Sequence, residues 1–200
     1  MELRKRLSPE RCAFVIIDIQ NDFCHSEGFF SRKGNNVTHL RKVIEPIQRV
    51  EAKARQVGIP VIYIRTEHDS TNNSEMWVER TEWARPGLVC QTGSWGAEFY
   101  EIKPKPGDIV ITKYRYSAFA QTHLELVLRS LGRDSLLFAG LTTSVCVESS
   151  VRDGLMKEFH VATLEDGCAE ISQSQHEATL KVLQNYFGPV VNSEQVITCW

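Results

Sequence analysis

The amino-acid sequence predicts a three-layer α/β/α domain built on a doubly wound, mainly parallel sheet of six strands. Two observations lead to this prediction. Short runs that are apolar throughout recur along the chain, which is typical of strands buried on both faces of a parallel sheet. Between these runs lie segments in which apolar residues recur with the period of a helix. Strands and helices that alternate in this way indicate a doubly wound α/β fold.

Each expected strand is a short apolar run, and several follow a residue that favours a turn. Gly58 precedes the second run, Pro106 and Gly107 precede the third, and Gly132 precedes the fourth. The fifth run follows a helical segment, and the sixth has the weakest pattern. The strands are expected over residues 13–17, 60–64, 108–112, 135–139, 160–164 and 195–198.

The segments between the strands are of two kinds. Most show helical spacing, and helices are expected over residues 37–56, 122–129, 145–156 and 175–187. The region 67–100 is the least regular, and it contains three of the four tryptophans, Trp77, Trp83 and Trp95. Because a long irregular stretch inside a compact domain is usually functional, this region is expected to form a wall or lid over a pocket.

Composition places the chain among ordinary globular proteins, with one domain expected over residues 1–200. Apolar residues make up 42% and charged residues 24%, which excludes a disordered chain. The formal charge of −2 gives no strong field, so neither nucleic acid nor a membrane is expected as a partner. A charged N-terminal stretch without a long apolar run, and six cysteines without metal-binding or disulfide spacing, predict a cytoplasmic protein with reduced thiols.

Chemically active residue types follow three of the expected strands. Asp18 follows the first strand, Lys113 the third, and the segment 140–146 the fourth. Because ligands of open α/β sheets bind beyond the carboxyl ends of the strands, we expect these groups to meet at one edge of the sheet. Structural alternatives stay open: Asp18 can cap a turn while Asp22 competes as the carboxylate, and Lys113 can keep its ammonium in water.

Position singles out Cys146 among the cysteines. It lies where the fourth strand ends and a helix begins, and Thr142, Thr143 or Ser144 can supply the N-cap. The positive end of the helix dipole favours a thiolate there, and free backbone N–H groups can bind an oxyanion. The alternative is a cysteine packed at a strand–helix junction, since free cysteines are among the most buried residues.

Together, Asp18, Lys113 and Cys146 can carry out acyl transfer. The cysteine attacks a carbonyl carbon, and the carboxylate takes the thiol proton and later gives a proton to the leaving nitrogen. A nearby ammonium keeps the carboxylate ionised and favours the thiolate. This combination predicts hydrolysis of an amide or related C–N bond through a thioester.

Three motifs resemble the isochorismatase-like cysteine hydrolases over nearly the whole chain. They are VIIDIQNDF, with Asp18; GDIVITKYRYSAFAQTHLELVLRSLG, with Lys113; and LLFAGLTTSVCVESSVRDG, with Cys146. The resemblance implies the fold of that family and a catalytic triad of these three residues. It also implies a non-proline cis peptide bond between Leu141 and Thr142, and an oxyanion hole formed by the backbone N–H groups of Thr142 and Cys146.

Departures from the family's patterns narrow the expected activity. Nicotinamidases of the family carry a metal site in a T-x-D-x-H segment after the second strand, whereas this chain has RTEHDSTNN, with His68 and Ser70 in place of the Asp and His. Neither a metal nor a cofactor is therefore expected. His68 is expected to be a loop residue, with a substrate contact as the alternative. Isochorismatases that cleave a vinyl ether do not rely on the cysteine, so the full triad argues against that activity.

The segments KYRYSAF and VCVESSVRDG are most similar to ureidoacrylate amidohydrolases, N-carbamoylsarcosine amidase and biuret hydrolase. We therefore expect an amidohydrolase for a small linear amide, ureido or carbamoyl substrate. A nicotinamidase-like or isochorismatase-like hydrolase and a non-catalytic binding protein are the alternatives. Tyr116 and Gln20 are expected to bind substrate, with a core tyrosine and a polar strand-end cap as their alternatives. The resemblance also implies a homo-oligomer, either a dimer or a tetramer.

Overall fold

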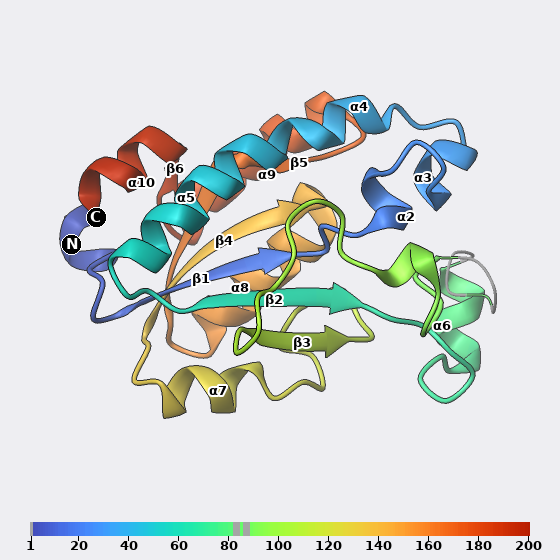
Figure 1. Ribbon diagram of the computed structural model, residues 1–200, viewed down its shortest axis with the longest axis horizontal. Helices are drawn as coiled ribbons and strands as arrows, with labels where there is room; N and C mark the ends of the chain where they lie inside the picture. Colours follow the sequence, from blue (N-terminus) through green and yellow to red (C-terminus); the bar gives the residue numbers. More distant parts are fainter. Residues whose placement is uncertain (1, 82–84, 86–88) are drawn as a thin grey trace.

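The computed structural model describes residues 2–81, 85 and 89–200, and a six-stranded parallel sheet forms its centre (Figure 1). The strand order is β3-β2-β1-β4-β5-β6, and each neighbouring pair is parallel. This topology confirms the predicted doubly wound α/β fold. The strands are β1 (Cys12–Ile17), β2 (Val61–Thr66), β3 (Ile109–Lys113), β4 (Ser135–Leu141), β5 (His160–Ala169) and β6 (Val190–Val191).

Helices cover both faces of the sheet and complete the three layers (Figure 1). One face is covered by α5 (Ile44–Gln56) and α10 (Ser193–Cys199), whose buried side chains join one apolar core. The other face is covered by α7 (Leu124–Ser130), α8 (Glu148–Met156) and α9 (Gln173–Tyr186). The shorter helical segments are α1 (Leu3–Arg6), α2 (Asn21–Cys24), α3 (Phe29–Arg32), α4 (Val37–Leu40), η1 (Arg41–Val43), α6 (Glu75–Arg80), η3 (Trp95–Ala97) and η4 (Thr143–Val147).

The two central strands, β1 and β4, explain why the sequence pattern predicts the sheet. Every residue of β1 and β4 is buried, because both faces of these strands lie under helices. They therefore appear in the sequence as uninterrupted apolar runs. Among the described residues, no helix has both the length and the apolar character needed to cross a membrane.

The C-terminal end differs from the prediction. Residues 195–198, expected as the sixth strand, belong to helix α10, and the sixth strand is Val190–Val191. A capping box starts the helix directly after β6: the side chain of Asn192 accepts a hydrogen bond from the N–H of Gln195, and the side chain of Gln195 accepts one from the N–H of Asn192. The short apolar run contributes the buried Val196 to the face of a helix, not to a strand.

The end of β4 lies unusually close to β1. Gly140 has a φ of 127°, and a Cβ atom at this position would lie 2.0 Å from the carbonyl oxygen of Ile17. Only glycine allows this approach without steric conflict. β1 and β4 are also the strands at which the strand order reverses, which is where open α/β sheets bind ligands. The sheet therefore places a candidate site beyond the ends of β1 and β4.

Candidate active site

Asp18 is the first residue after β1, and the backbone turns sharply there. Its φ is 56°, in the left-handed region that few non-glycine residues occupy. The N–H of Asp18 still donates to the carbonyl of Ile64 in β2, at 3.0 Å. At the end of β2, the hydroxyl of Thr66 donates to Oδ1 of Asp18, also at 3.0 Å. These contacts hold a buried carboxylate at the carboxyl edge of the sheet.

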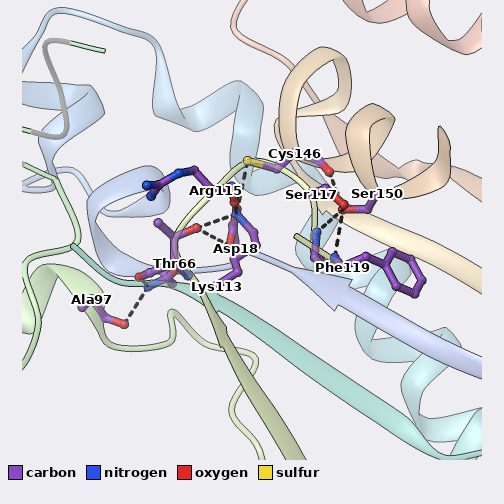
Figure 2. A network of polar contacts seen from close by, with 11 residues as sticks. Asp18, Thr66, Ala97, Lys113, Arg115, Ser117, Phe119, Cys146 and Ser150 are labelled. Carbon is purple, nitrogen blue, oxygen red and sulfur yellow. Dashed lines mark hydrogen bonds and ion pairs between the residues drawn. The ribbon is translucent and has the colours of Figure 1, made fainter. Parts of the chain in front are cut away.

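Lys113, the last residue of β3, extends across the end of β2 to this carboxylate (Figure 2). Its Nζ lies 2.8 Å from Oδ2 of Asp18 and donates to Oγ1 of Thr66 at 2.6 Å. The side chains of Asp18 and Lys113 are each 1% exposed. Burial alone lowers the pKa of Lys113, but the charge of Asp18 and the contact with Cys146 raise this pKa above its ordinary value. Lys113 is therefore an ammonium ion at neutral pH.

Cys146 lies in η4, the helical turn between β4 and α8. Its Sγ is 3.4 Å from Nζ of Lys113, and the nearby carboxylate of Asp18 raises the pKa of its thiol. Ser150 donates to the carbonyl of Cys146 at 2.7 Å and accepts from the N–H of Ala118 at 2.9 Å, which ties the turn to the segment after β3. The structure thus brings together Asp18, Lys113 and Cys146, as their positions after three strands predict (Figure 2).

The structure corrects two expectations about Cys146 in part. Thr142, one of the three N-cap candidates, is the N-cap residue of the turn that carries Cys146, but its side chain makes no capping hydrogen bond. The buried carboxylate of Glu170 serves instead, accepting from the N–H of Ser144 at 3.0 Å and from its hydroxyl at 2.6 Å. In addition, burial raises the pKa of the Cys146 thiol to about 12, because it outweighs the lowering effect of Lys113. The free protein therefore holds a thiol, not a thiolate.

The remaining acidic and thiol candidates lie outside this cluster. Asp22 accepts hydrogen bonds from the N–H groups of Phe29, at 2.9 Å, and Cys90, at 2.7 Å. It therefore joins two segments of the backbone, and Asp18 is the carboxylate that faces Cys146. The other thiols are those of Cys12, Cys24, Cys90 and Cys168, which are buried, and Cys199, which is partly exposed.

A cavity opens beside Cys146 and encloses about 570 Å³, its open mouth included. Much of its wall is apolar and comes from Phe23, Phe30, Trp77, Val89, Leu141 and Val145. Tyr116 lines the cavity as predicted, and its ring centroid lies 5.0 Å from that of Trp77. The irregular region thus supplies part of the wall through Trp77. Trp95 instead contacts His25, at 4.9 Å between ring centroids, and Trp83 lies outside the described residues.

Gln20 does not occupy the predicted place. It is fully buried and is absent from the cavity lining. Its side-chain amide donates to the carbonyls of Thr66, at 2.9 Å, and Ala97, at 2.8 Å, and accepts from the N–H of Thr66 at 2.8 Å. The amide is therefore used in holding β2 against the segment around Ala97. The strand-end alternative describes Gln20 better than substrate contact does.

Two residues that the sequence argument missed border the reacting groups. Thr66 joins Asp18 to Lys113 through its hydroxyl. It is the last residue of the second strand, and a predicted strand two residues longer would have included it. Arg115 lines the cavity two residues after Lys113, and its guanidinium lies 4.7 Å from the ring centroid of Trp77. Local sequence gave no sign of this contact, because Trp77 comes from α6, far away in the chain.

His68 and the peptide bond before Thr142 both border the cavity. His68 lines the cavity, and its Nδ1 lies 3.0 Å from Oδ1 of Asn73. It is thus more than a loop residue. Within residues 2–81, 85 and 89–200, no group of three or more His, Cys, Asp or Glu side chains could hold a metal ion. The peptide bond between Leu141 and Thr142 is cis, as the resemblance implies.

With this geometry established, comparisons with known proteins identify the family. The Isochorismatase domain family matches residues 12–195, so the chain belongs to the isochorismatase family. A curated relative from Acinetobacter baylyi, ureidoacrylate amidohydrolase RutB, is 32% identical over 96% of this chain and 84% of its own length. The RutB protein of Methylobacterium radiotolerans is 33% identical over 91% of this chain and 76% of its own length. The chain is a hydrolase of the class to which these amidohydrolases belong, acting on C–N bonds.

Solved structures agree with the fold and the family. A cysteine hydrolase from Pseudomonas syringae pv. phaseolicola superimposes with a TM-score of 0.87 at 26% identity, over 97% of this chain and 94% of that one. N-carbamoylsarcosine amidase from Thermoplasma acidophilum superimposes with a TM-score of 0.76 at 27% identity, over 92% of this chain and 97% of that one. Both chains share the three-layer architecture along almost their entire length.

Proposed function

We propose that this protein is a cysteine amidohydrolase that cleaves a C–N bond of a small linear amide, ureido or carbamoyl substrate through a thioester. One observation carries the proposal. Lys113 Nζ lies 2.8 Å from Asp18 Oδ2 and 3.4 Å from Cys146 Sγ, and all three residues line one cavity. A cation is thereby in contact with both a base and a nucleophile.

In the first half of the reaction, the thiol and the substrate carbonyl combine. As Sγ of Cys146 forms a bond to the carbonyl carbon, Asp18 takes the thiol proton, and the carbonyl electron pair moves onto oxygen. The backbone N–H groups of Thr142 and Cys146 are the proposed donors to this oxyanion. Asp18 then gives its proton to the leaving nitrogen, the C–N bond breaks, and ammonia or an amine departs from a thioester.

In the second half, water replaces the sulfur. Asp18 takes a proton from the water molecule as its oxygen bonds to the thioester carbon. The C–S bond then breaks, and the proton returns to Cys146, so that the free thiol is restored. In the first half a base must act on the thiol, because the pKa of Cys146, about 12, leaves almost no thiolate at neutral pH. Lys113 stabilises the transient thiolate and the carboxylate by its positive charge.

The names of the relatives define which substrates to test first. The relatives described above are named for ureidoacrylate and N-carbamoylsarcosine, in which a C–N bond of a ureido or carbamoyl group is the natural target. We propose the same chemical group for this chain. The substrate panel therefore contains ureido acids, N-carbamoyl amino acids and simple primary amides, with ammonia release as the common signal.

The experiment compares Cys146→Ala and Cys146→Ser with Cys168→Ala, a matched buried cysteine absent from the cavity lining. We expect both Cys146 variants to lose at least about 10³-fold in kcat on the best substrate, since the nucleophile is gone. The Cys168 variant should keep its activity. Acid-quenched wild type should also carry the acyl group as added mass on Cys146. Near-normal turnover by Cys146→Ala would overturn the proposed mechanism.

Two further expectations stay predictions. The homo-oligomer, dimer or tetramer, is tested by sedimentation velocity of the purified protein over a range of concentrations. A cytoplasmic location is tested by fractionation of cells that express the full chain. A single species of the protomer's mass at all concentrations would contradict the first expectation.

A further inference from the structure

The charges that line the cavity are unbalanced within the described part of the chain. The charged side chains of the lining are those of Asp18, Lys113 and Arg115. Asp18 and Lys113 form an ion pair at 2.8 Å and compensate each other. Arg115 has no such partner: among residues 2–81, 85 and 89–200, no carboxylate lies within ion-pair distance of its guanidinium, which donates instead to the carbonyls of Asn72 and Tyr114.

The other titratable lining group does not cancel this charge. His68 lines the same cavity, and its pKa is lowered, first by burial and further by the charges of Lys113 and Arg115, against the hydrogen bond with Asn73. His68 is therefore neutral at pH 7. The site consequently carries one positive charge in excess over its described lining, next to an apolar wall where charge interactions are strong.

The guanidinium of Arg115 is held in place before any substrate binds. Its backbone carbonyl accepts a hydrogen bond from Lys113 at 3.2 Å, and its Nη1 donates to the carbonyl of Asn72 at 3.0 Å. The planar group lies over Trp77, 4.7 Å from the ring centroid. In Figure 2 it extends to one side of the Asp18–Lys113–Cys146 cluster. In the described structure its hydrogen bonds all use Nη1, and Nε and Nη2 make none.

Arg115 also stands where two environments meet. It lines the largely apolar cavity beside Cys146 and, with Asn72, Asn73, Ser74 and Gln121, a neighbouring polar hollow. A molecule with an uncharged reacting end and an anionic far end matches this arrangement. Its amide or ureido group would lie at Cys146, and its anion at the polar border.

We infer that Arg115 binds a carboxylate of the substrate, and that the enzyme therefore selects ureido or N-carbamoyl acids over neutral ureas and amides. The inference rests on the proposed function. A guanidinium edge presents two parallel N–H groups, which match the two oxygens of a carboxylate, and such paired bonds are stronger than neutral ones. Trp77 fixes the plane of this edge, so the carboxylate determines which carbonyl carbon reaches Cys146.

The test compares two substrates of the same shape. N-carbamoylglycine carries the carboxylate, and N-isobutylurea replaces it by an isopropyl group. We expect wild-type kcat/KM to favour the acid by at least tenfold. Arg115→Met should lower this acid-to-urea ratio by at least tenfold, mainly through KM for the acid, and Arg115→Lys should retain part of the preference. Arg80→Met is the matched control: it removes a positive charge near Tyr116 but outside the cavity lining, and should leave the ratio within about twofold.

A binding measurement separates this inference from the proposed reaction. Calorimetric titration of Cys146→Ser with N-carbamoylglycine is repeated on Cys146→Ser/Arg115→Met, which should bind the acid at least tenfold more weakly. Binding that depends on Arg115 without turnover by wild type would leave the inference standing and overturn the reaction. Turnover with equal preference for acid and urea, or an unchanged ratio in Arg115→Met, would overturn the inference alone. Neither binding nor turnover of the acid would overturn both.

Discussion

The buried ion pair between Lys113 and Asp18 offers a direct test of how function and stability oppose each other. The two charges lie 2.8 Å apart and each side chain is only 1% exposed. Removing them from water costs several kcal/mol per ion, and their attraction repays this only while both are present. The perturbation is a double-mutant cycle of Lys113→Met, Asp18→Asn and the combined variant, measured by urea unfolding at pH 7.

The magnitude follows from the burial of the pair. Lys113→Met leaves the carboxylate of Asp18 buried without its cation, and we expect a loss of about 3–5 kcal/mol in the free energy of unfolding. Asp18→Asn leaves the ammonium unpaired and should cost a similar amount. The combined variant has no buried charge at this position, so it should lie within about 2 kcal/mol of wild type. The coupling energy is then at least about 4 kcal/mol, while all three variants lack activity.

A second cycle on an exposed pair is the control. Lys157 and Glu125 also lie 2.8 Å apart, but their side chains are 37% and 41% exposed. We expect a coupling energy below about 1 kcal/mol, since water screens this pair. Equal coupling in the two cycles, or additive losses for Lys113→Met and Asp18→Asn, would refute the argument that burial makes the pair costly to break.

Three further predictions concern neighbouring groups. Thr66→Val removes the hydroxyl bonded to Lys113 and Asp18, so it should lower kcat at least about tenfold and the free energy of unfolding by about 1–3 kcal/mol. Thr66→Ser keeps the hydroxyl and should stay near wild type in steady-state kinetics and urea unfolding. Because the pKa of Cys146 is raised to about 12, the rate of its alkylation by iodoacetamide should rise about tenfold per pH unit from about pH 7 to 10. Peptide mass spectrometry measures this rate, and a plateau in that range would contradict the raised pKa. Gly140→Ala should cost more than about 3 kcal/mol in urea unfolding, against about 1 kcal/mol for Gly93→Ala, where a Cβ meets open space; equal losses would refute the packing argument.

The main site residues were predictable because parallel strands end at a common edge. Asp18, Lys113 and Cys146 each follow a buried apolar run, so the topology alone brings them together. The same rule applied to the full length of β2 leads to Thr66. That residue was missed because its strand was predicted to stop at residue 64, before the polar positions Arg65 and Thr66.

The site features that the sequence did not predict depend on contacts between distant segments of the chain. Nothing near Gln20 in the sequence shows that its amide is occupied by the backbone of Thr66 and Ala97. The place of Arg115 depends on Trp77 from another helix. The pKa of Cys146 depends on burial, which opposes the effect of Lys113, and only the packed structure shows which effect is larger.

The register between β2 and β3, which pairs Thr66 with Lys113, gives the activity a diagnostic use. Lys113 and Thr66 end β3 and β2, Asp18 directly follows β1, and Cys146 lies in η4 after β4, so the site depends on four adjacent strands. A slip of one residue between two of these strands turns a side chain to the opposite face of the sheet. Molecules with a shifted strand register therefore have no activity, instead of a reduced kcat. The fraction of Cys146 that a substrate can acylate should therefore count correctly assembled sheets in a preparation, while kcat per active site stays constant.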